Sequence, residues 1–284
     1  MSASAAEIVI INCSTKEITA LALASAVRQA TLPVTVIDCE STDGSVEFFR
    51  HLQQQLPFRI AQLPLRRHGV TLDRVFRETA CGALLLLDSD AEILDPELVP
   101  RMLAALRPGT YGSGFLHGGE WLAAAHGRGR ETGYYAPRMW IPCAMLDVAA
   151  VRDALAAGVS FRQHVLGNEV PQLPWLAQLL CLRFMVPGLR NVRLDVLRPL
   201  RRDHHGQRPH FVYRDTGANV HDYFVRTRGL QFADLGGDHW PKAVAHDHGV
   251  TRRALRPWKG NAADAVASRA RAVARLAMTY GVKL

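Results

Sequence analysis

Four short apolar runs, separated by segments of helical spacing, dominate the first 105 residues. The apolar runs cover residues 7–12, 34–38, 59–63 and 83–88, and the helical patterns cover 15–30, 43–56, 71–80 and 96–105. Strands that alternate with helices of this length form a mostly parallel sheet with helices on both faces. The sequence therefore predicts an α/β fold, with the leucine run 84–87 in a buried central strand.

Two of these runs end in aspartate. Asp38 ends "VTVID", and Asp88 ends "LLLLD", with Asp90 two residues later. Ligands of open α/β sheets bind at the carboxyl ends of the strands, so we expect these carboxylates to lie at the functional edge. Two hard oxygen ligands suit Mg²⁺ or Mn²⁺, which keep coordination positions for phosphate oxygens. Capping of the following turn is the alternative role for both aspartates of the pair.

The totals exclude several classes of protein. A chain of 284 residues can form one large domain. Its net charge of +8 suits a phosphorylated ligand or an anionic lipid surface, but it lacks the aromatic pattern and the helix-turn-helix of nucleic-acid binders, so no nucleic acid is expected. Five dispersed cysteines without a CxxC pair argue against a zinc ribbon or a disulfide framework.

The location follows from what the sequence does not contain. No apolar run approaches the roughly 20 residues that span a bilayer, and the N-terminus has no basic segment of a signal peptide. We expect a cytoplasmic protein, with peripheral contact at the inner membrane face left open. The second half predicts strands and then a helix over 110–119 and 134–155, a helix over 217–229, a strand over 230–235 and an amphipathic helix over 261–282.

Two stretches carry a resemblance to a known family. "VIDCESTDGS" (36–45) and "RHGVTLDRVFRETACGALLLLDSD" (67–90) resemble the matching segments of family 2 glycosyltransferases with the GT-A fold, and the similarity covers roughly residues 6–107. The resemblance implies a single GT-A domain over 1–284, with a nucleotide-sugar-binding half (1–120), an acceptor-binding half (121–260) and a C-terminal helix (261–284). It also implies transfer of a sugar from a nucleotide-diphosphate sugar, UDP-sugar favoured, to an acceptor hydroxyl with inversion.

The resemblance assigns nucleotide-binding roles in the first half. Asn12 and Ser14 would lie near the nucleotide base, and Asp38 would contact the base or the ribose. Asp43 would support its loop, and Asp73 would face the nucleotide from the third helix. The dipeptide Asp43-Gly is also a common turn signal, so a turn role is the alternative there.

The resemblance assigns metal and phosphate roles as well. Asp88 would contact the ribose or the metal, and Asp90 would be the principal ligand of Mn²⁺ or Mg²⁺. The late segment "AHDHG" offers His248 first and His246 second as a further metal ligand. Arg252 would neutralise the leaving diphosphate, or else lie in solvent.

The acceptor side is expected in the second half. Asp215 is the candidate general base, with the N-cap of the following helix as its alternative role. Trp121, Tyr134, Tyr135 and Trp140 flank the region where such enzymes build the acceptor site, or else belong to the core. The expected partners are the nucleotide-diphosphate sugar and a carbohydrate, lipid-linked or small-molecule acceptor.

Three other functions compete with a transferase. A haloacid-dehalogenase-type phosphohydrolase would use Asp88 as nucleophile, but Glu92 stands where Thr or Val is usual, and a later acidic pair is reduced to Asp238. A sugar-nucleotide pyrophosphorylase needs a glycine-rich loop after the first strand, and "IINCSTKE" has no glycine. A non-catalytic nucleotide-sugar-binding GT-A module would not need the intact pair Asp88 and Asp90.

Overall fold

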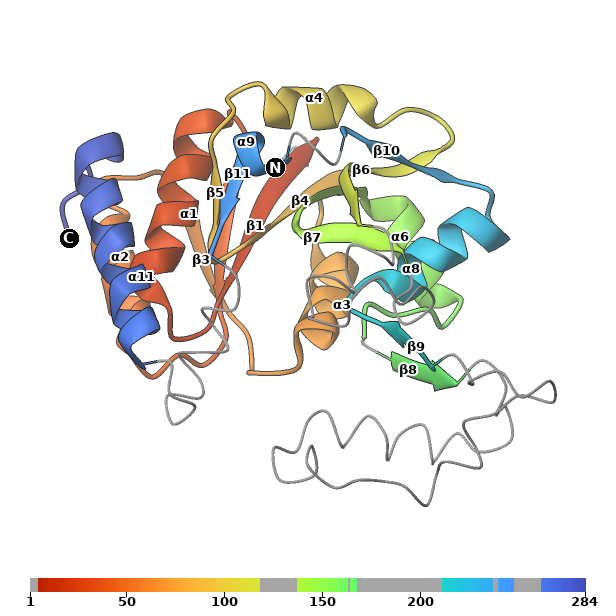
Figure 1. Cartoon of the computed structure of the whole chain (residues 1–284), viewed down its shortest axis with the longest axis horizontal. Helices are drawn as coiled ribbons and strands as arrows, with labels where there is room; N and C mark the ends of the chain where they lie inside the picture. Colours follow the sequence, from red (N-terminus) through yellow and green to blue (C-terminus); the bar gives the residue numbers. More distant parts are fainter. Residues whose placement is uncertain (1–4, 118–136, 163, 168–210, 237–239, 248–261) are drawn as a thin grey trace, which may run out of the picture.

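A seven-stranded sheet forms the centre of the molecule (Figure 1). The computed structural model describes residues 5–117, 137–162, 164–167, 211–236, 240–247 and 262–284. The strands of this sheet, in the spatial order β10-β6-β7-β4-β1-β2-β3, are Gln231–Asp234, Thr110–His117, Arg138–Asp147, Ala83–Asp88, Ala6–Asn12, Val34–Asp38 and Arg59–Gln62.

Most neighbours in this sheet are parallel. β1 pairs in parallel with β2 and β4, β2 with β3, and β10 with β6. Only β7 runs antiparallel in this part of the structure, between β4 and β6. Helices cover both faces, so the predicted α/β class with a mostly parallel GT-A-like sheet is confirmed.

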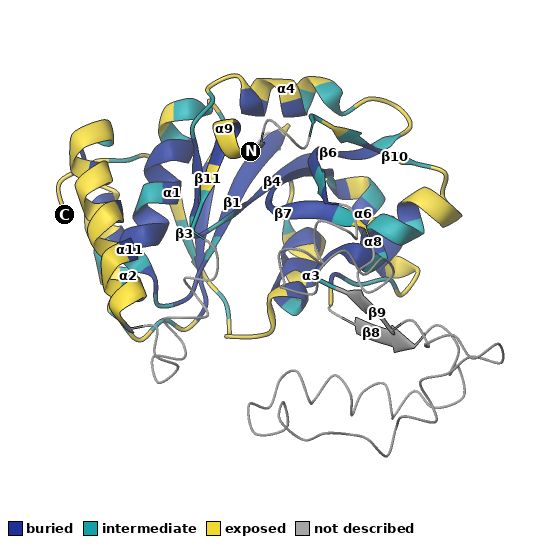
Figure 2. Ribbon diagram, in the orientation of Figure 1, coloured by how far each residue is buried: buried dark blue, intermediate teal, exposed yellow. Residues whose placement is uncertain are grey.

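Successive leucines of β4 point into two separate cores. Leu85 and Leu87 pack with helices α1 (Lys16–Gln29), α2 (Ser45–Leu52) and α4 (Leu98–Ala105). Leu84 and Leu86 pack with α3 (His68–Glu78), α6 (Val148–Ala156) and α8 (Ala218–Asp222). All four leucines are at most 3% exposed. A strand buried on both faces has no polar alternation, which explains the unbroken leucine run. β4 is buried up to Leu87 and less so at Asp88, and Figure 2 shows most of the strand buried.

The predicted elements of the first half are confirmed, with shifted helix ends. α2 covers eight residues rather than 43–56, and α3 begins at His68 rather than at 71. The predicted helix 217–229 is α8 followed by the π-helical turn η4 (Tyr223–Thr227), and the chain then turns at Gly229, whose φ is 64°. The C-terminal helix is α11 (Ala262–Arg275), which continues as the turn η6 (Leu276–Tyr280).

Two small antiparallel sheets were not predicted from the sequence. β5 (Ala91–Ile93) pairs with β11 (Val244–His246), which follows the short helix α9 (Trp240–Ala243). β8 (His164–Gly167) pairs with β9 (Phe211–Arg214). The first pair matters for the site, because it brings a segment near the C-terminus to the chain that leaves β4.

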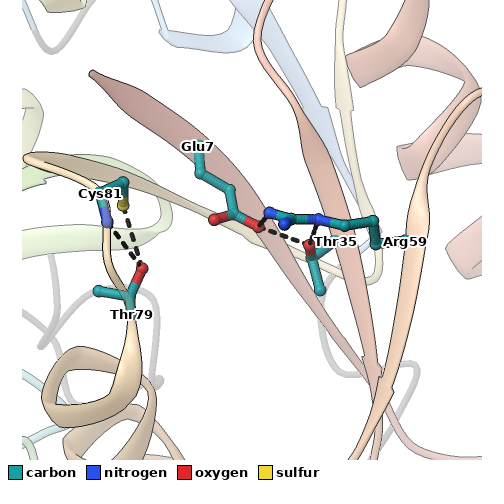
Figure 3. A network of polar contacts seen from close by, with 5 residues as sticks. All are labelled: Glu7, Thr35, Arg59, Thr79 and Cys81. Carbon is teal, nitrogen blue, oxygen red and sulfur yellow. Dashed lines mark hydrogen bonds and ion pairs between the residues drawn. The ribbon is translucent and has the colours of Figure 1, made fainter. Parts of the chain in front are cut away.

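A polar network joins β1, β2 and β3 near their amino-terminal ends (Figure 3). Arg59 on β3 donates from Nη2 to Oε1 of Glu7 on β1 at 2.6 Å, and from Nε to Oγ1 of Thr35 on β2 at 3.2 Å. Thr35 itself donates to Glu7. This buried carboxylate is therefore bound by neighbouring strands and belongs to the scaffold.

Among the described helices, none combines the length and the apolar character that crossing a membrane requires.

Candidate functional site

Two aspartates and a histidine meet where β4 ends. The chain leaves β4 at Asp88, turns through Asp90 and enters β5, against which β11 places His246 opposite Ala91. His246 Nε2 lies 3.0 Å from Oδ1 of Asp90 and 3.9 Å from Oδ2 of Asp88. One potential ligand atom from each of the three residues lies within 4.8 Å of the others. We call these three residues the Asp-Asp-His group.

The group is largely enclosed. The side chains of Asp90 and His246 are each 7% exposed, whereas that of Asp88 is 29% exposed. Burial raises the pKa of Asp88, as does the charge of Asp90, while the neighbouring cations His68, His246 and Arg138 act in the opposite direction. Burial lowers the pKa of His246, but the bond to Asp90 and the surrounding carboxylates outweigh it, so the pKa is raised overall.

The donor set fits a divalent cation. Two carboxylates held together in a partly buried place repel each other, and a cation between them would relieve that repulsion. Carboxylate oxygens suit both Mg²⁺ and Mn²⁺, whereas an imidazole ligand favours Mn²⁺ of the two. Asp88 has the most exposed side chain of the three, so the group is accessible to solvent from the side of Asp88.

A residue of β7 packs against the ring of His246. β7 pairs with β4 up to Leu87 and Cys143, and Pro142 then lacks the N–H that would continue the ladder. The ring of Trp140 stands edge-on to that of His246, with centroids 5.4 Å apart and planes at 90°. Trp140 is 2% exposed and also contacts the ring of His117. Trp140 is thus a core residue that supports His246 and not an open platform for an acceptor sugar.

The loops after β1 and β2 meet at the same edge of the sheet. Asn12 is fully buried and donates to Oδ1 of Asp38 at 2.7 Å and to Oγ of Ser41 at 3.0 Å. Its Oδ1 accepts hydrogen bonds from Thr15 and Thr19. Both donors and the acceptor of this amide are therefore used within the chain. Asn12 and Asp38 hold the two loops together, and direct contact of either with a nucleotide stays a prediction.

Ser14 and Asp43 complete the link between these loops. The backbone N–H of Ser14 donates to Ser41 Oγ at 2.8 Å, and Ser14 Oγ accepts from the backbone N–H of Thr42 at 3.2 Å. Ser14 has a φ of 53°, which a serine adopts only under such constraint. Asp43 accepts from the backbone N–H groups of Lys16 and Ser45, so its place in the structure agrees with the expected support of the loop.

Asp73 binds a neighbouring segment of the chain. Its Oδ1 accepts from the backbone N–H of Phe161 at 2.9 Å, and its Oδ2 accepts from Ser160 Oγ at 2.6 Å. Gly69, one helical turn earlier, lets the same segment approach, because an added Cβ would lie 2.5 Å from the carbonyl oxygen of Phe161. The side chain is 3% exposed and anchors residues 160–161, and contact of Asp73 with a nucleotide stays a prediction.

Asp215 is paired with an arginine that the sequence reasoning did not single out. Arg138 Nη2, at the start of β7, lies 2.8 Å from Oδ2 of Asp215, and both side chains are mostly buried. Asp215 follows β9 and precedes Gly217 and α8, and its Oδ1 accepts from the backbone N–H of Thr216 at 2.8 Å. The N-cap position of α8 is Gly217, so the alternative role of Asp215 as N-cap is not what the structure shows.

The C-terminal helix is bound to the strands that carry the group. Arg275 donates from Nε to both oxygens of Glu92 on β5, at 2.7 and 2.6 Å, and Tyr280 donates to the same carboxylate at 2.7 Å. Arg271 lies 2.9 Å from Oδ2 of Asp247, the residue after His246. The arginine-rich composition of this helix is the one sequence signal that could have pointed to these pairs.

Several predicted residues lie outside the described part of the chain. These are His248, Arg252, Trp121, Tyr134, Tyr135 and Asp238. The second-choice metal ligand, His246, lies in the described part of the chain and contacts Asp90.

Comparisons with known proteins point to one group of structures. No protein-family model and no curated protein matches the chain. Among solved structures it is similar to the mannosyltransferase PcManGT from Pyrobaculum calidifontis in complex with GDP-Man and Mn²⁺, at 13% identity over 100% of this chain and 77% of that one, with a TM-score of 0.42.

Two further structures are matched over part of their length. TarS from S. aureus is 16% identical over 52% of this chain and 48% of that one, with a TM-score of 0.37. Glucosyl-3-phosphoglycerate synthase from Mycobacterium tuberculosis is 15% identical over 52% and 58%, with a TM-score of 0.36. The match thus spans about half the length of these two proteins. The three neighbours are glycosyltransferases of the GT-A fold.

Proposed function

We propose that the chain is a metal-dependent glycosyltransferase that transfers a sugar from a nucleotide-diphosphate sugar, UDP-sugar favoured, to an acceptor hydroxyl with inversion. The observation that carries this proposal is the Asp-Asp-His group at the carboxyl end of the central strand. This is the edge where open α/β sheets bind their ligands. Two aspartates and a histidine would leave coordination positions for phosphate oxygens of the donor.

The residues of the group would hold Mn²⁺ or Mg²⁺. Asp90 and His246 are already in contact and buried, so they would fix the position of the ion. Asp88 is more exposed and would face the donor as well as the ion. A bound divalent cation supplies charge stabilisation for the diphosphate as it leaves.

The loops after β1 and β2 would receive the nucleoside. They are linked to each other through Ser14, Ser41 and Asp43, so the surface that they offer is held in one conformation. A pre-ordered loop loses less conformational entropy when it binds a ligand. Asn12 and Asp38 contribute to binding through this link between the loops.

Asp215 is the candidate that accepts the proton of the acceptor hydroxyl. Inversion by direct displacement requires such a base on the acceptor side of the sugar. What supports this is that Asp215 pairs with Arg138, which shares a face of β7 with Trp140, the residue whose ring contacts that of His246. Arg252 and His248 stay candidates for contact with the diphosphate.

The acceptor is proposed only by class. A carbohydrate, a lipid-linked sugar and a small molecule all present hydroxyl groups of suitable chemistry. A cytoplasmic location, with peripheral contact to the inner membrane face for a lipid-linked acceptor, stays a prediction.

The test is the melting temperature with UDP, GDP, dTDP and CDP, each with and without Mn²⁺. A ligand that binds only the native state at about 100 times its Kd adds about 2.7 kcal/mol to the unfolding free energy. We expect one nucleotide to stabilise the protein only with Mn²⁺, and Asp90→Asn to abolish this effect. Asp153→Asn, a change at a residue that is 66% exposed, is the matched control and should behave as wild type.

A hydrolysis assay beside the melting temperatures tests for the competing phosphohydrolase. Stabilisation by no nucleotide, together with hydrolysis of p-nitrophenyl phosphate that Asp88→Asn abolishes, would replace the transferase by an enzyme that uses Asp88 as nucleophile.

A further inference from the structure

Arg138 is a buried cation whose two terminal nitrogens both have partners, and Nη1 donates to the carbonyl oxygen of Met139 at 3.2 Å. It is the first residue of β7, and its side chain is 11% exposed. Its Nη2 lies 2.8 Å from Oδ2 of Asp215, a carboxylate that is 17% exposed. A guanidinium is a rigid planar fork with five N–H donors, so fixing one nitrogen also fixes the direction of the others.

Another donor of Arg138 has no partner among the described residues. Its Nε–H is buried and donates no hydrogen bond in the described part of the chain. Leaving a buried donor without an acceptor costs about 1–3 kcal/mol, and more when the group is charged. A folded protein tolerates this cost most readily where a ligand supplies the acceptor.

The location of Arg138 indicates which ligand this is. Residues two apart on a strand share a face, so Arg138 starts from the face of β7 that carries Trp140. The ring of Trp140 contacts that of His246, a member of the Asp-Asp-His group. An anion bound at the Asp-Asp-His group through a metal would therefore lie next to the guanidinium.

We propose that the Nε–H of Arg138 donates to the diphosphate of the sugar donor, and that Asp215 positions Arg138 for this contact. The inference rests on the proposed function and adds a phosphate-binding residue to it. Arginine matches the spacing of phosphate oxygens, and a charge-assisted hydrogen bond is about twice as strong as a neutral one. The positive charge would stabilise the negative charge that develops on the leaving diphosphate. Asp215 thereby acts through Arg138, in addition to any role as proton acceptor.

The test is calorimetric titration of inorganic pyrophosphate in the presence of Mg²⁺, which does not depend on the unknown base. The proteins are the full chain, Arg138→Gln, Arg138→Lys and Asp215→Asn, with Arg74→Gln on the exposed face of α3 as control. Loss of a charge-assisted hydrogen bond predicts a roughly 10- to 150-fold weaker pyrophosphate affinity for Arg138→Gln. Arg138→Lys keeps the charge without the fork and should fall between wild type and Arg138→Gln.

Two further readouts separate positioning from mere folding. Mn²⁺ affinity in the absence of pyrophosphate, followed by electron paramagnetic resonance, should stay within about threefold of wild type in all four variants, because none of them removes a ligand. Asp215→Asn should weaken pyrophosphate binding at least threefold while Mn²⁺ affinity is retained. A residue that acted only as a base would leave pyrophosphate binding unchanged and lower kcat alone.

Each contrary outcome has a distinct meaning. Wild-type affinity for pyrophosphate in Arg138→Gln overturns the phosphate-binding role. Wild-type affinity in Asp215→Asn, with weak binding in Arg138→Gln, overturns the positioning role. Failure of the wild-type protein itself to bind either Mn²⁺ or pyrophosphate overturns the proposed function, and the role of Arg138 falls with it.

Discussion

His246 Nε2 lies 3.0 Å from Oδ1 of Asp90, although 156 residues separate the two in the chain. The contact depends on three-residue strands, because β11 pairs with β5 directly after the aspartates. The backbone N–H of Asp247 also donates to the carbonyl oxygen of Asp90 at 2.9 Å. Backbone pairing thus sets the side-chain geometry of the Asp-Asp-His group before any ligand is bound.

Replacing His246 should weaken metal binding specifically. His246→Ala removes one of the three proposed ligands, and we expect Mn²⁺ affinity to fall at least tenfold, since loss of residues that only support metal ligands already costs about 10- to 100-fold. Electron paramagnetic resonance of free Mn²⁺ during titration measures this. His51→Ala, at an exposed position on α2, is the control. Equal Mn²⁺ affinity in wild type and His246→Ala would remove His246 from the site.

Adding a methyl group at Gly69 should destabilise the fold. The new Cβ would lie 2.5 Å from the carbonyl oxygen of Phe161, so the segment that Asp73 binds must move. We expect Gly69→Ala to lower the unfolding free energy by about 1–3 kcal/mol, as overpacking does. Urea denaturation at 25 °C measures this.

A double-mutant cycle tests the shared cause of that loss. Gly69→Ala and Asp73→Ala disturb the same contact. The loss of unfolding free energy in the double mutant should therefore be smaller than the sum of the two single losses by at least about 0.5 kcal/mol. Full additivity would show that Asp73 and Gly69 act on different parts of the structure.

The stability of the protein should fall in mild acid because of His221. Burial lowers the pKa of His221 from 6.5, against the smaller effect of Asp222, and the hydroxyl of Tyr111 lies at hydrogen-bond distance from its Nδ1. The unfolded chain then binds a proton more readily than the native state. This contribution to stability is therefore complete above about pH 6.5 and is lost as the pH falls through the lowered native pKa.

The measurement for His221 is a comparison of variants across pH. The unfolding free energy of wild type and of His221→Asn is measured between pH 8 and pH 5. The difference between the two should shrink toward acid pH, because the variant has no proton to take up at this position. A difference that is constant with pH would contradict a lowered pKa for His221.

Removing Arg275 should loosen the C-terminal helix from the site. Glu92 has a side chain that is 5% exposed and accepts two bonds from Arg275 and one from Tyr280. We expect Arg275→Ala to lower the unfolding free energy by about 1.5–3 kcal/mol, the range for hydrogen bonds to a charged group. Arg50→Ala, whose partner Glu47 is 75% exposed, should cost less than about 0.5 kcal/mol. Equal losses in the two variants, measured by urea denaturation, would contradict a special role for the Glu92 contact.

The elements of the first half could be predicted because their signals are local. β1, β2, β3 and β4 each combine an apolar run with a helical pattern after it, and their pairing follows from the parallel sheet that such repeats form. The position of Asp88 at the end of β4 follows from the leucine run itself. The three-residue strands β5 and β11 have no periodicity of their own, so the sequence reasoning did not separate them from loops.

The roles of buried polar residues were harder to predict. Asp73 matched a sequence pattern, but its direction depends on the segment 160–161 that packs over α3. Arg138 lies in a strand that was expected, yet only its contact with Asp215 distinguishes it from the other arginines of the chain. A side chain's partners across 70 or more positions depend on packing, which local composition does not contain.

The sequence by itself determined the mostly parallel sheet and the two aspartates that leave its central strand, because strand periodicity and the run of buried leucines are local properties. Only the tertiary structure decided that His246 joins those aspartates and that Arg138 joins Asp215. The physical reason is that both contacts are made across antiparallel pairings and strand ends whose neighbours are distant in the chain. Their geometry exists only once the sheet and its two cores are formed.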